Sequence, residues 1–167
     1  MKNGLLPGFM YDCEIVRAGR VIDSFREENI IPIEGMQFIA SLLLDGGAVP
    51  TSLWYLGLLD TGFTPLATST LAQAAASENA AYTTSSNARL GWTHVYDDAY
   101  GITNVAAKAE FAFPSGGTIN GVFLTNGITR GSSGSSTLLS VANFSTTRTL
   151  SAGDVLRSTA GLTLSSV

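Results

Sequence analysis

Apolar and polar residues alternate along several short stretches of the chain, which is the pattern of β-strands with one buried face. The alternation is clearest where Ala109, Phe111 and Phe113 face one way and the residues between them face the other. Further strands are expected at 53–59, 89–93, 105–113, 118–124, 137–144 and 155–164. Two more runs, 10–17 and 20–25, flank a short turn and predict a β-hairpin with one charged face.

One segment departs from the two-residue period. After Pro32, the apolar residues recur at helical spacing, and an Asp-Gly-Gly sequence at 45–47 ends the run. The residues of this stripe are Met36, Ile39, Ala40, Leu43 and Leu44. We predict one α-helix over about residues 33–45, with the stripe in the core. Residues 64–87 are rich in Ala, Ser and Thr and predict a long loop or insertion, within which 70–76 are able to form a short helix.

These elements predict a mainly β fold: an antiparallel β-sandwich or jelly roll with one α-helix and an N-terminal arm. Residues 1–10 are assigned to the arm, because Gly4, Pro7 and Gly8 resist regular structure. Residues 11–167 are assigned to a single sandwich domain. At 167 residues the chain is long enough to bury its own core.

Charge is sparse and slightly acidic. Charged residues make up 13% of the chain and the net charge is −4, with no cluster of Lys or Arg. We therefore expect no nucleic-acid partner and no anionic membrane surface. The apolar run at 35–44 is shorter than the roughly 20 residues of a membrane-spanning helix, and the one at 4–11 is too short for a signal peptide. The protein is expected to be made in the cytoplasm, with its single Cys13 as a small buried residue.

The best candidate for chemistry lies around His94, the single histidine, with Asp97 and Asp98 close by among Trp92, Tyr96 and Tyr100. Such a group resembles a metal or sugar site, but a closed zinc site needs four ligands and no second His or nearby Cys supplies them. We expect an exposed loop anchored by aromatic side chains.

Other catalytic motifs are missing from the sequence. There is no G-x-S-x-G, P-loop, G-x-G-x-x-G or EF-hand pattern. Neighbouring carboxylates at 27 and 28, or at 97 and 98, would point to opposite faces of a strand and so could not flank one bond. We predict no enzyme activity, no catalytic residue, no cofactor and no metal site.

Three stretches carry a resemblance to a known family. They are SFREENIIPIEGM at 24–36, WYLGLL at 54–59, and a series made of AKAEF at 107–111, GVFLT at 121–125, LSVANF at 139–144 and AGDVLR at 152–157. Together they resemble small structural proteins of tailed bacteriophages, especially podoviruses. The resemblance implies a capsid cement or decoration protein, a sandwich or jelly-roll subunit bound to the outside of the major capsid protein shell in the virion. It also implies contacts with copies of itself, as a dimer or a trimer.

The surface that would meet the shell is expected near the N-terminus. The arm carries Leu5, Leu6, Phe9 and Met10, which are too apolar to be left in water. The hairpin adds Arg17, Arg20 and Arg26 among acidic residues, and such mixed charges can fix the register of a contact. Two other functions stay open. One is a tail or fibre-associated module that contacts host glycan through the loop at 92–100; the other is a glycan hydrolase, which the sparse carboxylates and single histidine disfavour.

Overall fold

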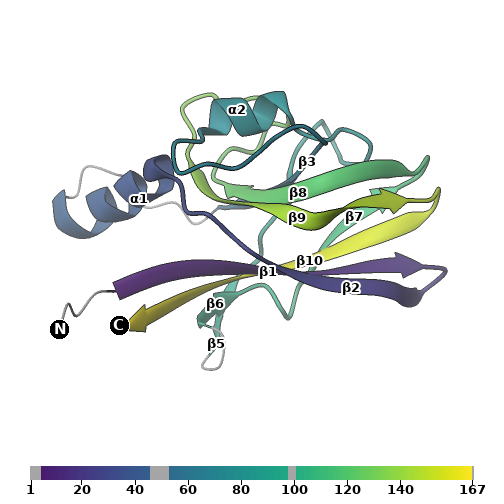
Figure 1. Cartoon of the computed structure of the whole chain (residues 1–167), viewed down its shortest axis with the longest axis horizontal. Helices are drawn as coiled ribbons and strands as arrows, with labels where there is room; N and C mark the ends of the chain where they lie inside the picture. Colours follow the sequence, from purple (N-terminus) through teal and green to yellow (C-terminus); the bar gives the residue numbers. More distant parts are fainter. Residues whose placement is uncertain (1–4, 46–52, 98–100, 167) are drawn as a thin grey trace.

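The computed structural model describes residues 5–45, 53–97 and 101–166, which form two antiparallel sheets packed face to face (Figure 1). Sheet A runs in the order β2 (Arg20–Glu28), β1 (Leu5–Arg17), β10 (Asp154–Ser166), β6 (Gly101–Thr103) and β5 (Val95–Asp97), with β7 (Ala109–Phe113) also paired to β10. Sheet B runs in the order β4 (Leu90–Gly91), β3 (Tyr55–Leu59), β8 (Gly117–Thr125) and β9 (Leu138–Leu150). The predicted mainly β sandwich is confirmed.

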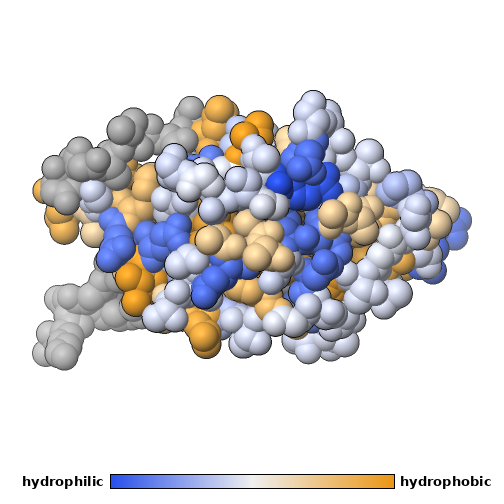
Figure 2. Space-filling model, turned by 90° about the horizontal axis from the view of Figure 1, so that it is seen from above, coloured by the Kyte–Doolittle hydropathy of each residue, from blue (hydrophilic) through white to orange (hydrophobic). Residues whose placement is uncertain are grey.

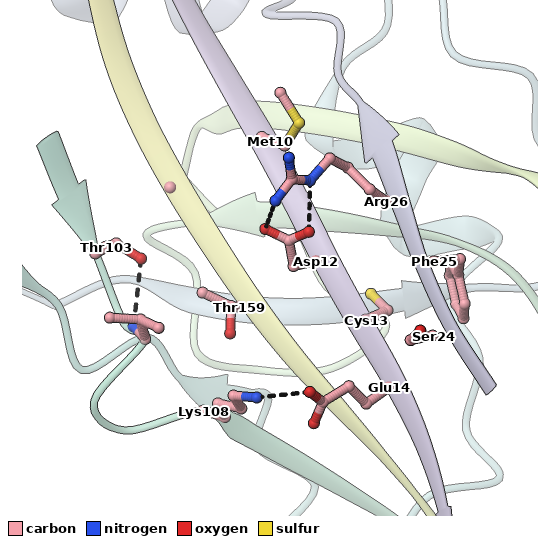
Figure 3. A pocket seen from close by; sticks show the side chains of 12 residues that line it. Met10, Asp12, Cys13, Glu14, Ser24, Phe25, Arg26, Thr103, Lys108 and Thr159 are labelled. Atoms are coloured by element: carbon pink, nitrogen blue, oxygen red, sulfur yellow. Dashed lines mark hydrogen bonds and ion pairs between the residues drawn. The ribbon is translucent and has the colours of Figure 1, made fainter. Parts of the chain in front are cut away.

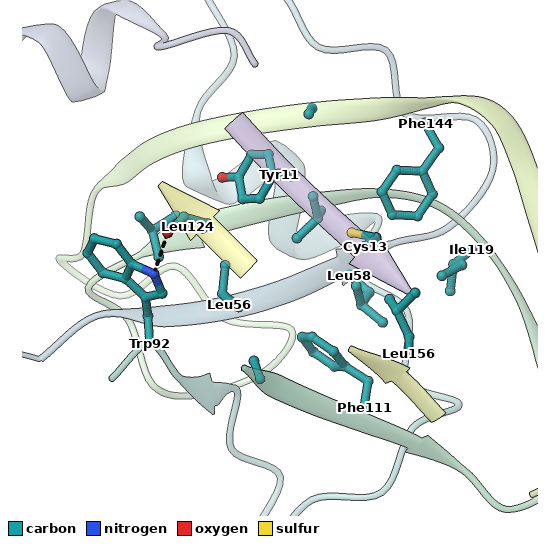
Figure 4. Close-up of a cluster of buried hydrophobic side chains, with 14 of the residues drawn as sticks. Tyr11, Cys13, Leu56, Leu58, Trp92, Phe111, Ile119, Leu124, Phe144 and Leu156 are labelled. Carbon is teal, nitrogen blue, oxygen red and sulfur yellow. Dashed lines mark hydrogen bonds between the residues drawn. The ribbon is translucent and has the colours of Figure 1, made fainter. Parts of the chain in front are cut away.

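The core lies between the sheets and collects inward side chains of β1, β3, β7, β8, β9 and β10 (Figure 4). On β1 the inward side chains are Tyr11, Cys13 and Ile15, and on β7 they are Ala109, Phe111 and Phe113, as the alternation predicts. Burial raises the pKa of the Cys13 thiol to about 12, because the thiolate would lose its hydration there.

The first strand corrects the prediction of an N-terminal arm. β1 begins at Leu5 and pairs with β10 from Leu5 to Val16, so residues 5–10 are part of sheet A; residues 1–4 lie outside the described part. Pro7 is tolerated because β2 pairs with β1 only from Met10 onward, which leaves the first part of β1 with a ladder on one side. The arm was predicted because Gly4, Pro7 and Gly8 disfavour regular structure. The pairing of β1 with β10, which joins the two ends of the chain, is not visible in the local sequence.

The predicted helix is present as α1 (Ile33–Ala40), which continues into a π-helical turn, η1 (Ser41–Asp45). Gly35 lies against β9: a Cβ added there would be only 2.6 Å from the Leu139 carbonyl oxygen. The Glu34 carboxylate accepts hydrogen bonds from the backbone amides of Leu71 (3.0 Å) and Leu138 (2.9 Å). One face of α1 is thus fixed to the sandwich by close backbone approach and by two charge-assisted hydrogen bonds.

The side of α1 that packs inward is not the predicted one. Phe38 and Ile39 pack against the core, and the Phe38 ring meets Trp54 edge-on with 5.6 Å between centroids. The remaining members of the predicted stripe, Met36, Ala40, Leu43 and Leu44, are exposed. The prediction of a core stripe is wrong for these four because the helix is apolar on both sides, and Gly35 decides which side can approach β9.

A second helix, α2 (Leu71–Ala76), covers the outer face of sheet B (Figure 1). Thr70 caps it by accepting from the Gln73 amide, and the Gln73 side chain accepts in turn from the Thr70 amide. Its buried side chains pack in a second cluster; the members are Leu59, Phe63, Leu71, Ala74, Phe123, Leu138 and Val141. The short helix expected within residues 70–76 is confirmed, and the segment around it is part of a third layer.

A buried ion pair ties the loops to this outer layer. The Glu78 and Arg89 side chains are both 0% exposed, with 2.8 Å between Arg89 Nη2 and Glu78 Oε2. Arg89 also donates to the carbonyls of Gly127 (2.8 Å) and Ser132 (3.0 Å), while the Gly131 amide donates to Glu78 Oε2 (2.7 Å). The pair therefore holds the glycine- and serine-rich loop at 131–136 against the sandwich by its backbone.

One flank of the sandwich is closed by a seam between β2 and β9. Glu27 Oε1 accepts hydrogen bonds from both the amide (2.7 Å) and the hydroxyl (2.8 Å) of Ser145. Just beyond β2, Ile30 forms a backbone bridge with Val141. The Phe25 and Phe144 rings meet edge-on at 4.9 Å, so the seam is apolar inside and polar at its rim.

Candidate protein-binding groove

The outer face of sheet A carries the polar half of the β1 pattern. Because Tyr11 and Cys13 point into the core, Met10, Asp12 and Glu14 point outward. The register aligns these residues with outward positions of the neighbouring strands. The three rows are Glu28–Met10–Gly161–Thr103, Arg26–Asp12–Thr159 and Ser24–Glu14–Arg157–Glu110.

Ion pairs cross this face in three places. Arg26 forms a bidentate pair with Asp12, with Nε–Oδ1 and Nη2–Oδ2 distances of 2.6 and 3.0 Å. Lys108 Nζ lies 2.9 Å from Glu14 Oε1, and Arg157 Nε lies 2.8 Å from Glu110 Oε1. All of these side chains keep contact with solvent, so each pair stabilises the fold by about 0–1 kcal/mol at most.

Between the Arg26 and Lys108 pairs lies a groove of about 560 Å³ (Figure 3). Its floor is β1 and β10, where the small residues Thr159 and Gly161 leave room, and Met10 adds an apolar edge. One wall of the groove is the segment 103–108, which includes Val105 and Lys108. The groove is a shallow trough with apolar patches between two ion pairs.

Asn104 fixes the wall in place. Its side chain is fully buried, donates to the Ser158 carbonyl (3.2 Å) and the Ala107 carbonyl (3.3 Å), and accepts from the Ala160 amide (2.7 Å). Because two of these hydrogen bonds join the wall to β10 and the third closes the wall on itself, the groove is preformed, which reduces the ordering cost of binding.

The groove is suited to binding. Asp12 and Glu14 each face a cation at hydrogen-bonding distance. Across the part of the chain that the structure describes, no group of three or more His, Cys, Asp or Glu side chains could hold a metal ion. The residues fit contact with another protein. The charges would set the register of the contact, and the apolar side chains at the edge and the wall would be buried by it.

The predicted contact residues lie in different parts of the structure. Met10 and Arg26 line the groove, and Arg20 lies at the hairpin end of the same sheet. Arg17 is bound to Asp154 by two hydrogen bonds of 2.8 Å, which lower the pKa of that carboxyl. Phe9 is in the core, so its predicted role in contacting a partner is wrong. For Leu5 and Leu6, only the backbone is described.

The aromatic segment at 92–97 does not form a joint site in its described part. The Trp92 indole is buried and donates to the Ala160 carbonyl (3.1 Å), and the His94 ring stacks on it at 4.3 Å. Tyr96 on β5 is 75% exposed. The Asp97 side chain and residues 98–100, including Asp98 and Tyr100, lie outside the described part, so the predicted neighbours of His94 are not all in view.

Sequence reasoning missed several groove residues. Lys108 and Val105 stand in a stretch that was predicted to be one strand from 105 to 113, whereas β7 begins at Ala109. The charge pairing of Lys108 with Glu14 joins residues 94 positions apart. The alternation along β1 did predict part of this surface. Once Tyr11 and Cys13 were assigned to the core, Asp12 and Glu14 had to face outward.

Comparison of the chain with protein-family models found no matching family, and searches of curated proteins and of solved structures found no similar protein. Within the described residues, no helix has the length and apolar character to cross a membrane.

Proposed function

We propose that this protein is a structural component of a virus particle, a cement or decoration protein that binds the outer surface of the major capsid shell. The groove of sheet A is the surface that would meet the shell. The observation that carries the proposal is the fixed pattern of opposite charges around this preformed trough, at Asp12, Arg26, Glu14 and Lys108. The resemblance of residues 24–36 and 107–157 to phage structural proteins supplies the class of partner.

The physical basis is electrostatic complementarity. The Arg26 and Asp12 side chains are 62% and 47% exposed, so both can form a second contact with a partner without leaving each other. Charges in fixed positions select the register and orientation of a contact more than they raise its affinity. The apolar side chains of Met10 at the edge and Val105 on the wall would contact an aliphatic or aromatic side chain from a shell loop, which adds buried area.

A charge swap tests the groove directly. The double variant Asp12→Arg with Arg26→Asp keeps the internal ion pair and the net charge but inverts the sign pattern that a partner meets. In pelleting with capsids that lack the protein, we expect its affinity to fall at least about tenfold, since like charges brought together across an interface cost several kcal/mol, more than the roughly 1.4 kcal/mol of a tenfold change. Ala72→Glu on the exposed side of α2, in the opposite layer, is the control and should bind normally.

Two results would count against the proposal. One is full capsid occupancy by the charge-swapped variant. The other is retention of the wild-type protein on DNA with no binding to capsids. Thermal unfolding of the swapped variant should match the wild type, because the pair is exposed and remains intact.

A second candidate, a tail-associated module that contacts host glycan, is supported by the exposed ring of Tyr96. Aromatic rings can stack on sugar faces. The buried Trp92 is not available for such a surface, and Tyr100, the third ring that the sequence suggested, lies outside the described residues. Glycan-array binding that is lost in Tyr96→Ala, with capsid binding unchanged, would favour this function.

A further inference from the structure

The outward face of α1 and η1 carries an apolar stripe. Ile33, Met36, Ala40 and Leu43 follow one another at spacings of three and four, and Leu44 lies beside them. Leu43 and Leu44 are 73% and 86% exposed. Figure 2 shows some apolar side chains, beside polar ones, at the end of the molecule from which α1 projects. We call these five residues the α1 stripe.

Two further leucines are exposed on segments that contact α1. Leu66 is exposed next to Ala67, whose carbonyl accepts from the Ile33 amide (2.8 Å). Leu53 is exposed next to Trp54, whose ring contacts Phe38 on α1. A helix that is apolar on both sides is usually buried on both sides. Here the inner side is fixed by Gly35 and Glu34, so the helix cannot turn to hide the stripe.

We propose that the α1 stripe is the contact between two copies of this chain, packed helix against helix across a two-fold axis. The argument is one of complementarity. Residues 35–44 carry no charge, and Gln37 is the one polar side chain on the exposed face of α1 besides the stripe. A surface of this kind meets its own copy without burying an unpaired charge, as a two-fold contact requires. The inference goes beyond the shell-binding proposal, which uses the outer face of sheet A and charged groups.

The exposed area fits a reversible dimer. The counted residues are the large side chains of the stripe together with Leu53 and Leu66. Their exposed fractions add up to the surface of three to four fully exposed side chains. At about 60–120 Å² of apolar surface each, they supply roughly 200–450 Å² per copy. A standard interface buries about 800 Å² per partner, with an apolar centre and a polar rim. The stripe is therefore the right size for the centre of such a contact, and the dimer should form and dissociate with concentration.

Sedimentation of the purified full chain over about 1–500 µM tests this without capsids. We expect a concentration-dependent dimer. The double variant Leu43→Glu with Leu44→Glu should raise the dissociation constant more than about 100-fold, because each copy loses its two most exposed leucines and gains like charges across the axis. Val21→Glu with Ile22→Glu is the matched control: both side chains are about half exposed on β2, and this variant should dimerise like the wild type.

A disulfide test reports on the two-fold geometry. Ala40→Cys, midway along the stripe, should give a covalent dimer under mild oxidation, since the native Cys13 is buried and stays reduced. Ala72→Cys on α2 should remain monomeric. A monomer at every concentration, a trimer, or a dimer that survives both glutamate changes would overturn the proposal. Because the charge swap at Asp12 and Arg26 leaves the stripe intact, failure of the dimer and failure of shell binding are separate results.

Discussion

Neutralising Glu78 should destabilise the fold strongly, because Arg89 would lose its counter-charge inside the protein. In Glu78→Gln the guanidinium stays 0% exposed and the Gly131 amide loses a carboxylate acceptor. Breaking a buried pair by changing one partner costs about 3–5 kcal/mol, a large part of the 5–15 kcal/mol that holds a typical domain together. For a chain of this size, each kcal/mol shifts Tm by about 2–4 °C, so Tm should fall by about 6–20 °C.

The matched control is Glu110→Gln. Its partner Arg157 also lies at 2.8 Å, but the two side chains are 56% and 38% exposed, so the loss should be about 0–1 kcal/mol. Urea and thermal unfolding followed by fluorescence suit the measurement, since Trp54 and Trp92 are both buried. Equal stability losses in the two variants would refute the reasoning that burial, and not the short distance, gives the Glu78 pair its importance.

Three further predictions follow from burial and packing. The Cys13 thiol, buried and with its pKa raised to about 12, should not react with a thiol reagent at pH 8 until the chain is unfolded; rapid labelling of the native protein would contradict this. The hydrogen bonds from Arg17 lower the pKa of Asp154, so this carboxylate stabilises the fold above the unfolded-state value of about 4 and loses its contribution below it. The stability difference between wild type and Asp154→Asn should therefore be present at neutral pH and shrink as the pH falls below about 4, and a difference that does not change with pH would disprove the coupling. Gly35→Ala should cost about 1–3 kcal/mol in urea unfolding, because the added carbon would lie 2.6 Å from the Leu139 oxygen, whereas Gly91→Ala, with open space around it, should cost less.

The longer strands could largely be predicted from the sequence, and β7, β8, β9 and β10 all overlap the expected runs. β7 alternates because only one of its faces is buried, whereas β8 and β9 contain continuous buried runs that read as apolar stretches. β5 and β6 were missed, since each has only three residues and no period can be seen in so short a run. Their pairing depends on β10, which supplies the ladder for β6.

The groove could be predicted only in part. Met10 and Arg26 were expected at a partner surface, but the residues that shape the trough come from distant parts of the chain and meet through the β1–β10 ladder. Asn104 resembles an ordinary loop residue in the sequence, yet it is fully buried and fixes the wall. Local patterns do not contain such pairings, because they depend on which strands lie side by side.

The outer strand of a β-sheet offers free amide and carbonyl groups to any neighbouring molecule, and this is how many β proteins begin to aggregate. On the flank where β2 and β9 meet, the Ser145 amide is already bound by Glu27, and the Val141 backbone is paired with Ile30. Molecules crowded side by side on a surface would therefore meet blunted strand edges on this flank. Such crowding can bring molecules close together without pairing a strand of one molecule with a strand of the next. Each molecule then remains a separate folded unit that contacts its neighbours through side chains.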